Sequence, residues 1–313
     1  MMLDKHSAGL LAQFNQNTPD LHDVEISIET SREGARAMFL SLAGEVASHC
    51  EVQDLTVATG QHDIPVRVYR PNSGKSPRPV VVFAHGGGWS LGDLDCYDAL
   101  VRDLCQQSGA LFISVGYRLA PEHKFPAGLE DVISVSRWAV SQAQELGGDA
   151  ARIALMGDSA GGNLVLSASH RLQGKLPLAG LYLIYPVLDS HRPHHTYLSR
   201  VRFGDGDFLL TREAISDTCS WYLDKETPSD HPEVSPLFLP HFGNLPPTSL
   251  LLAGHDPLYD EGRLLADKLR QAGVLRRLHC FESTIHAFVS FGVLPIAQEA
   301  RAALAQQLRT DLF

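Results

Sequence analysis

The sequence has no long apolar run and no excess of positive charge. No stretch reaches the roughly 18 to 20 apolar residues that span a bilayer, and residues 1–6 lack the continuous apolar segment of a signal peptide. The 26 Lys and Arg residues are outnumbered by 36 Asp and Glu residues, and the formal net charge is −10. Because such a chain repels a phosphate backbone, we expect no nucleic-acid partner and no stable membrane association.

Cysteine is also scarce. The five cysteines are scattered, odd in number and without a C-x-x-C pair, which favours a reducing compartment and predicts a cytoplasmic protein. The histidines His191, His194 and His195 lack the spacing of a recognised metal site, so we expect no metal ion. Internal repeats and low-complexity segments are absent from the sequence as well.

Short apolar runs alternate with segments of helical character, which predicts an α/β fold. A mostly parallel central sheet with helices on both faces is expected, because continuous apolar strands are typical of strands buried on both faces. In the segment 129–146, apolar residues such as Val132, Val135 and Ala139 recur at helical spacing. The expected strands are residues 80–84, 111–115, 153–156, 181–185 and 249–253, and the expected helices between them include residues 94–108 and 129–146. An alternating run at residues 64–69 predicts an edge or hairpin strand, because its Pro65 disfavours a central position.

Two segments interrupt this alternation. Residues 1–50 carry two helical candidates, around residues 3–16 and 32–48, and residues 189–232 carry one at 214–223. We interpret both segments as a helical cap over the carboxyl edge of the sheet, where open α/β sheets bind ligands. The alternative is a peripheral helical extension without a role in binding. The predicted organisation is therefore an N-terminal cap segment at 1–50, a core at 51–188, an inserted cap segment at 189–232 and the rest of the core at 233–313.

The pattern G-x-S-x-G occupies residues 157–161 and predicts a catalytic serine. It follows an apolar strand and precedes a segment compatible with a helix, which is the setting of a nucleophile elbow. The glycines allow a strained turn that leaves no room for a Cβ atom. Ser159 is therefore the candidate nucleophile.

A serine needs a base, and in this arrangement the acid and the histidine follow the serine in the chain. Asp256 comes directly after an apolar strand, and Asp260 is the alternative acid. Of the two histidines further on, His279 lies inside an alternating strand. His286 follows the short loop 283–285 and is the predicted base.

The glycine run at residues 86–88 follows the strand 80–84 and predicts an oxyanion hole. The backbone amides of Gly86 and Gly87, with that of Ala160, are the predicted donors to the oxyanion of a tetrahedral intermediate. The alternative is a phosphate-binding loop, but neither the G-x-x-x-x-G-K-[ST] nor the G-x-G-x-x-G spacing is present.

Several motifs resemble those of the hormone-sensitive-lipase family of α/β-hydrolases, especially its bacterial short-chain esterases. The resemblance covers about residues 60–290. Its motifs are residues 85–89 (HGGGW), 117–122 (YRLAPE), 125–127 (FPA), 157–164 (GDSAGGNL), 256–258 (DPL), 260–262 (DEG) and 286–288 (HAF). It departs from the family at Ala287, where glycine or a polar residue is common.

The resemblance implies a serine carboxylesterase that prefers short acyl esters, with both cap segments and without metal or organic cofactor. Trp89, Asp158 and Ala287 are candidates for the substrate pocket, although Trp89 is also explained by plain packing and Asp158 by a structural hydrogen-bonding role. The alternatives are an amidase or peptidase with the same triad, since fold does not determine function, and a non-catalytic small-molecule receptor. Formation of a homodimer is left open.

Overall fold

A sheet of eight strands runs through the molecule, with the order β1-β2-β4-β3-β5-β6-β7-β8. The computed structural model describes residues 2–17, 27–74 and 76–313. From β4 to β8 all neighbouring strands are parallel, whereas β1 and β2 run antiparallel to their neighbours. The strands are β1 (Cys50–Ala58), β2 (Asp63–Pro71), β3 (Arg78–Ala84), β4 (Leu111–Val115), β5 (Gly148–Asp158), β6 (Leu178–Ile184), β7 (Thr248–His255) and β8 (Leu275–Ile285).

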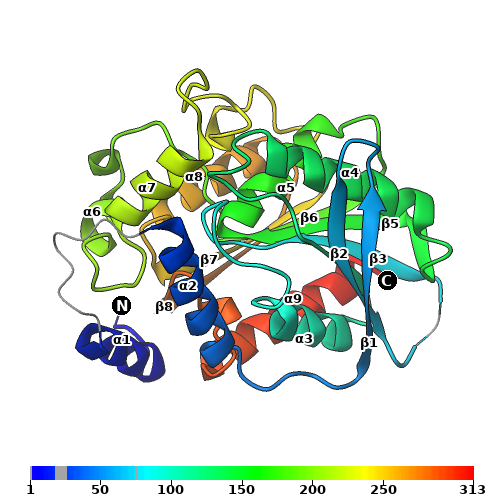
Figure 1. Cartoon of the computed structure of the whole chain (residues 1–313), viewed down its shortest axis with the longest axis horizontal. Helices are drawn as coiled ribbons and strands as arrows, with labels where there is room; N and C mark the ends of the chain where they lie inside the picture. Colours follow the sequence, from blue (N-terminus) through cyan, green and yellow to red (C-terminus); the bar gives the residue numbers. More distant parts are fainter. Residues whose placement is uncertain (1, 18–26, 75) are drawn as a thin grey trace.

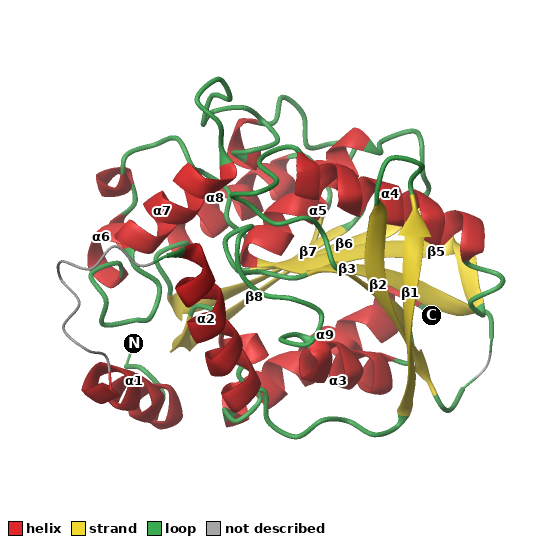
Figure 2. Ribbon diagram, viewed as in Figure 1, coloured by secondary structure: helices red, strands yellow, loops and turns green. Residues whose placement is uncertain are grey.

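Helices cover both faces of this sheet (Figures 1 and 2). The two sides of β3 show why: Val80 and Val82 belong to one apolar cluster, whereas Val81 and Phe83 belong to the other. The predicted α/β class with two buried faces is thus confirmed. One face carries α4 (Ala127–Gln142), α5 (Ser159–Arg171) and α8 (Tyr259–Gln271), and the other carries α3 (Asp98–Ser108) and α9 (Pro295–Leu312).

The N-terminal part of the sheet differs from the prediction. Strand β1 was not predicted, and β2 forms a hairpin with it but is not an edge strand, because β4 pairs with its other side. Pro65 is tolerated because the pairing of β2 with β4 covers only Val66 to Tyr69. Beyond that ladder, the carbonyl oxygen of Pro65 accepts the N–H of Gly116 at 2.9 Å. The missing amide of a proline therefore removes no bond from the β2–β4 ladder.

Two helices precede the sheet, as predicted, but the second has different ends. Helix α1 spans Lys5–Asn17 and α2 spans Ile28–Leu42. The Ser27 side chain caps α2 by accepting the N–H of Thr30 at 3.2 Å. The helix stops early because Gly44 has φ +78° and a Cβ there would lie 2.6 Å from the backbone carbon of Gly292.

The segment between β6 and β7 contains two short helices beside α2 at one end of the sheet (Figure 1). The predicted helix at 214–223 is found as α7 (Arg212–Tyr222), and its N-terminus is capped by Thr211. A further helix, α6 (Leu198–Phe203), was not predicted. Single 3-10 turns lie at η1 (His194–Thr196), η2 (Pro236–Phe238) and, after β8, η3 (Phe288–Ser290). Within the described ranges, no helix is long and apolar enough to cross a membrane.

The carboxyl ends of β3, β5, β6, β7 and β8 meet at one edge, because these strands are parallel. The loops after β3 and β7 and the turn after β5 therefore lie close together there. Strand β8 is longer than predicted and includes residues 283–285, which were expected to form a loop. His286 is thus the first residue after the strand, and pairing of Ile285 with His255 of β7 holds it at this edge.

The buried sheet predicts where the chain is most sensitive to substitution. Leu155 on β5 is fully buried, whereas Leu40 on α2 is 46% exposed. We expect Leu155→Ala to lower the free energy of unfolding by about 2–5 kcal/mol, because it removes apolar contacts and leaves a cavity. The matched substitution Leu40→Ala should change it by less than about 0.5 kcal/mol. Urea unfolding of both variants measures this, and equal effects would contradict the described core.

Candidate active site

Ser159 stands at a sharp turn between β5 and α5. Its φ is +51°, in the left-handed region, and the residue is 8% exposed. A Cβ on Gly157 would lie 2.4 Å from the backbone oxygen of Gly161, and a Cβ on Gly161 would lie 2.0 Å from the backbone oxygen of Ala84. No other residue fits at either position, so the two glycines of the motif allow the turn that presents the serine at the carboxyl edge.

Three side chains that are distant in the sequence meet at this turn. Ser159 Oγ lies 3.0 Å from Nε2 of His286, and Nδ1 of His286 lies 2.7 Å from Oδ2 of Asp256. Because a carboxylate only accepts hydrogen bonds, Nδ1 carries the proton and Nε2 is left to accept the serine hydroxyl. Asp256 is 1% exposed and His286 is 6% exposed, so little water competes for these bonds.

The two alternative residues occupy other positions. Asp260 lies in the first turn of α8, where its Oδ2 accepts the N–H of Ser199 at 2.8 Å. His279 lies inside β8 and stacks on Phe281, with ring centroids 4.6 Å apart. The structure therefore brings Asp256, and neither of these residues, to the imidazole of His286.

The glycine loop after β3 lies beside the serine turn. Gly87 has φ +109° and Gly88 has φ +58°. A Cβ on Gly87 would lie 2.2 Å from the backbone oxygen of Leu91, and one on Gly88 would lie 2.4 Å from the side chain of Thr218 on α7. Both positions thus require glycine, for backbone conformation and for space.

Gly86 differs from its predicted role. Its N–H donates to Oδ1 of Asp158 at 2.8 Å, and Tyr97 donates its hydroxyl to Oδ2 of the same carboxylate at 3.2 Å. The Gly86 amide is therefore engaged in holding the loop and is not available to an oxyanion. No hydrogen bond from the amides of Gly87 or Gly88 is found to any part of the chain that the structure describes. These two amides, with that of Ala160 in the first turn of α5, are the available donors.

A serine, an imidazole and a carboxylate are thus joined by hydrogen bonds at the carboxyl edge of the sheet. The family described as having the alpha/beta hydrolase fold matches residues 81–290. The chain belongs to the α/β-hydrolase family. The fold class and the family resemblance predicted from the motifs are thereby confirmed.

Relatives of this α/β-hydrolase align with almost the whole chain. Carboxylesterase NlhH of Mycobacterium tuberculosis is 39% identical over 282 residues, which cover 87% of this chain and 86% of the relative. Ethyl acetate hydrolase of Pseudomonas putida is 35% identical over 284 residues, covering 87% and 86% of the two chains. The solved structure of a hyperthermophilic esterase from the archaeon Pyrobaculum calidifontis has a TM-score of 0.91 and 33% identity, and the match covers 99% of both chains.

The three predicted pocket residues of this α/β-hydrolase lie close to the site but are all buried. Trp89 is 2% exposed and its ring stacks on Tyr222 of α7, with centroids 4.3 Å apart and planes 2° apart. Asp158, the last residue of β5, is 1% exposed and accepts the N–H of Gly86 in the glycine loop. Ala287 is 9% exposed and has φ +63° directly after His286. Packing accounts for Trp89 and loop support for Asp158, so a substrate contact of these residues stays a prediction.

The sequence prediction missed two buried residues that support the site. Tyr185 follows β6 and its ring lies 4.8 Å from the ring of His286. His85 follows β3, and its Nδ1 donates to the carbonyl oxygen of Gly86 at 2.8 Å. Burial lowers the pKa of His85 to about 4, so its ring is neutral at pH 7. Their position directly after parallel strands is the signal that could have identified them.

Two histidines of the segment between β6 and β7 hydrogen bond to serines. His191 Nδ1 lies 3.0 Å from Oγ of Ser229, and His194 Nε2 lies 2.9 Å from Oγ of Ser216. Each of these two rings thus has a hydroxyl partner of its own.

Asp158 gives the stability of the protein a pH dependence. Burial raises the pKa of Asp158 to about 7. The hydrogen bond from the Gly86 amide favours the carboxylate and opposes this rise in part. Between about pH 4 and pH 7 the folded protein therefore holds a proton that the unfolded chain has lost. This contribution to stability falls as the pH rises through that window and is constant above it.

We expect Asp158→Asn to remove this slope, because the amide oxygen still accepts the Gly86 N–H but carries no charge. From pH 5 to pH 8, the free energy of unfolding of the variant minus that of wild type should rise by about 2–3 kcal/mol. Urea unfolding of both proteins at the two pH values measures the difference. A stability difference that is the same at both would show that Asp158 does not titrate in this range.

Proposed function

We propose that this α/β-hydrolase is a serine carboxylesterase that hydrolyses short-chain acyl esters through an acyl-enzyme intermediate. The observation that carries the proposal is the hydrogen-bonded series from Ser159 through His286 to Asp256, beside a loop with unengaged amides. Hydrolysis of such an ester needs a nucleophile, a base and hydrogen-bond donors for an oxyanion, and the described residues supply all three.

The class of enzyme, an ester hydrolase, is confirmed. Relatives that cover most of the chain are named carboxylesterase NlhH, ethyl acetate hydrolase and arylesterase. The last of these, from Saccharolobus solfataricus, is 33% identical over 240 residues. The preference for short acyl chains and the role of each residue are our proposal.

In the first half of the reaction, Ser159 Oγ attacks the carbonyl carbon of the ester. His286 Nε2 accepts the hydroxyl proton, and Asp256 holds the ring in place and stabilises the imidazolium that forms. His286 then donates this proton to the oxygen of the leaving alcohol as the carbon–oxygen bond breaks. The acyl group stays on Ser159.

In the second half, water replaces the alcohol. His286 accepts a proton from the water while the water oxygen attacks the acyl carbon, and a second tetrahedral intermediate forms. The imidazolium returns the proton to Ser159 Oγ as the acid leaves. The enzyme is restored without any external acid, base or metal.

Both intermediates carry an oxyanion, and we assign its donors to Gly87, Gly88 and Ala160. Gly88 takes the place predicted for Gly86, whose amide is engaged by Asp158. One such preorganised donor stabilises the transition state by about 3–4 kcal/mol. Ala160 also lies at the N-terminus of α5, where the helix dipole favours negative charge.

The proposed cap consists of two segments outside the alternating core, the described part of residues 1–50 and residues 189–232. Its contacts with the glycine loop support this: Thr218 of α7 lies against Gly88, and Tyr222 stacks on Trp89. From α2, Arg32 donates to the carbonyl oxygen of Ser90 at 2.9 Å. Side chains held this close to the oxyanion donors restrict the space for an acyl chain, which favours short substrates.

Variants of the triad test the proposed roles. Ser159→Ala and His286→Ala should each lower kcat by at least about 10⁴-fold, because each removes a group that acts in every step. Asp256→Asn should cost a similar factor, whereas Asp260→Asn should cost much less, because Asp260 lies outside the triad and the amide oxygen of asparagine still accepts the Ser199 N–H. Circular dichroism checks that each variant is folded. A larger loss from Asp260→Asn than from Asp256→Asn would reverse our choice of acid.

A fluorophosphonate probe separates an enzyme from a receptor. We expect it to form an adduct on Ser159 of the folded protein, detected by mass spectrometry of the peptide, and to leave Ser159→Ala unmodified. A folded wild-type protein without an adduct would favour a non-catalytic receptor.

The substrate class is tested with p-nitrophenyl esters of two to sixteen acyl carbons, beside the matched p-nitroanilides. We expect kcat/KM to be highest for short esters and to fall for long chains, because the cap restricts the acyl site. A maximum at long chains would contradict the short-chain preference. Faster turnover of the anilides would establish the amidase alternative.

A further inference from the structure

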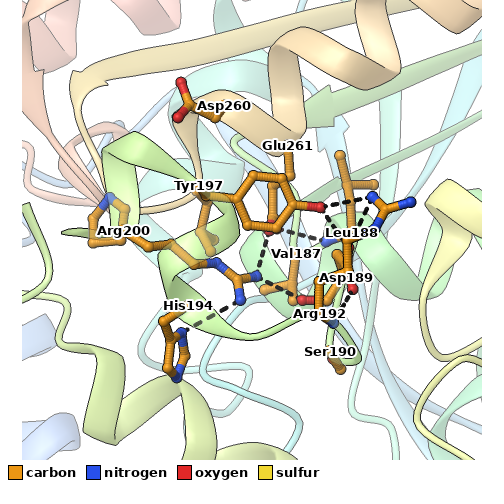
Figure 3. A network of polar contacts seen from close by, with 12 residues as sticks. Val187, Leu188, Asp189, Ser190, Arg192, His194, Tyr197, Arg200, Asp260 and Glu261 are labelled. Atoms are coloured by element: carbon orange, nitrogen blue, oxygen red, sulfur yellow. Dashed lines mark hydrogen bonds and ion pairs between the residues drawn. The ribbon is translucent and has the colours of Figure 1, made fainter. Parts of the chain in front are cut away.

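Helix α6 of the inserted segment binds the loop that carries Asp256. We call this contact the α6 clasp; it consists of Ser199 and Arg200 on α6 and of Pro257, Asp260 and Glu261 on the loop and the start of α8. Figure 3 shows Arg200 and Glu261 at the centre of a network of polar side chains. Sequence prediction identified neither α6 nor its two residues.

Ser199 makes three hydrogen bonds to the loop. Its Oγ donates to the carbonyl oxygen of Pro257 at 2.7 Å and accepts the N–H of Asp260 at 3.1 Å. Its own N–H donates to Oδ2 of Asp260 at 2.8 Å. Ser199 is 3% exposed, so these bonds are shielded from water and hold the loop residue that directly follows Asp256.

Arg200 extends the clasp to the first turn of α8. Its guanidinium forms an ion pair with Glu261 and donates to the carbonyl oxygen of Asp189 at 2.6 Å. The other carboxylate oxygen of Glu261 accepts the N–H of Leu188 at 2.8 Å. The side chains of Arg200 and Glu261 are 1% and 0% exposed. Glu261, five positions after Asp256, is thus bonded to two separate segments: the start of the insertion and α6.

The start of the insertion is itself ordered around Asp189. One carboxylate oxygen of Asp189 accepts the N–H groups of His191 and Arg192, each at 2.9 Å. The other accepts the hydroxyl of Tyr197, whose ring lies 4.9 Å from the Arg200 guanidinium carbon. Figure 3 shows Tyr197 and Asp189 converging beside Arg200. Arg200 is therefore contacted from several sides.

The clasped loop also determines where the Asp256 carboxylate points. Oδ1 of Asp256 accepts the N–H of Leu258 at 2.8 Å, and its carbonyl oxygen accepts the N–H of Tyr259 at 3.0 Å. Only Oδ2 is directed to His286. A shift of the loop backbone at Pro257 would move both bonds of the carboxylate together, and with them the imidazole.

Stability alone does not explain a buried ion pair at this place. Replacing such a pair with apolar residues of similar volume is often neutral or stabilising, because desolvation of the two charges offsets their attraction. A buried pair in which both carboxylate oxygens accept a hydrogen bond, as they do in Glu261, does restrict the geometry of the chain.

We propose that Ser199 and Arg200 are positioning residues, which hold the Asp256 loop so that the carboxylate meets His286 Nδ1. This inference rests on the proposed function, since it assigns α6 a part in that reaction. The inserted segment then has two roles: α7 covers the glycine loop, and α6 fixes the acid.

Ser199→Ala tests the proposal, with Ser167→Ala as the matched control. Ser167 is fully buried on α5 and its Oγ donates to the carbonyl oxygen of Glu233 at 3.0 Å, so the control removes a similar long-range bond away from the acid loop. We expect Ser199→Ala to lower kcat on p-nitrophenyl acetate by about tenfold or more with KM within about twofold, because misplacement of catalytic groups affects the chemical steps. Ser167→Ala should keep kcat within about twofold of wild type.

Further variants separate positioning from folding. Ser199→Thr keeps the hydroxyl and should restore most of the lost kcat. The double variant Arg200→Met with Glu261→Leu removes both buried charges. It should stay folded, which thermal unfolding checks, but its kcat should be lowered by a factor similar to that of Ser199→Ala. Equal kcat for Ser199→Ala and Ser167→Ala, or unchanged kcat in the folded double variant, would overturn the clasp. Wild-type protein that neither hydrolyses the ester nor reacts with the fluorophosphonate would instead overturn the proposed function.

Discussion

The close contact between the first turn of α5 and the end of β3 is the constraint on which the site depends. A Cβ on Gly161 would lie 2.0 Å from the backbone oxygen of Ala84, so the two backbones touch without any side chain between them. This contact places Ser159 beside the glycine loop that continues from β3. The backbone of Ser159, the proposed nucleophile, and the amides of Gly87 and Gly88 therefore have a fixed relation that does not depend on a flexible side chain.

The parallel sheet then brings the remaining groups to the same edge. Asp256 and His286 follow β7 and β8, and the pairing of these strands places the two residues close together although 30 positions separate them. Tyr185, which directly follows β6, packs against the imidazole at the same edge. Every group of the proposed mechanism thus occupies the first positions after a parallel strand, where side chains have freedom to point away from the sheet.

The segments outside the sheet are fastened to these loops by polar contacts. Arg32 of α2 reaches the carbonyl oxygen of Ser90 after the glycine loop, and the α6 clasp reaches the loop of Asp256. Hydrogen bonds have narrow geometric requirements, whereas apolar contacts tolerate sliding. Polar fastening of this kind is suited to segments whose position relative to a reacting group matters within a fraction of an ångström.

Local patterns in the sequence were sufficient for the fold class, most strands and the choice of Ser159, Asp256 and His286. These depend on apolar periodicity, on glycine spacing and on chain order, all of which are short-range or purely sequential. The hairpin partner β1 was missed because polar and charged residues interrupt its apolar positions and more than half of its residues are exposed. The run at β2 was predicted to be an edge or hairpin strand; the hairpin is found, but one proline does not reveal that a second strand pairs with the other side.

Only the tertiary structure decided how neighbouring glycines divide their tasks. Gly86 and Gly88 look alike in the sequence, but the buried carboxylate of Asp158 engages the amide of Gly86 and leaves that of Gly88 without an acceptor in the described chain. It likewise decided that Ser199 and Arg200, on a six-residue helix with no periodic signal, contact the loop of the acid. The sequence by itself determined the fold class and the candidates Ser159, Asp256 and His286, because apolar periodicity, residue type and chain order are properties of the sequence alone. Only the tertiary structure decided which side chains meet. Hydrogen-bond partners depend on distances between segments that are far apart in the sequence, and no local pattern specifies those distances.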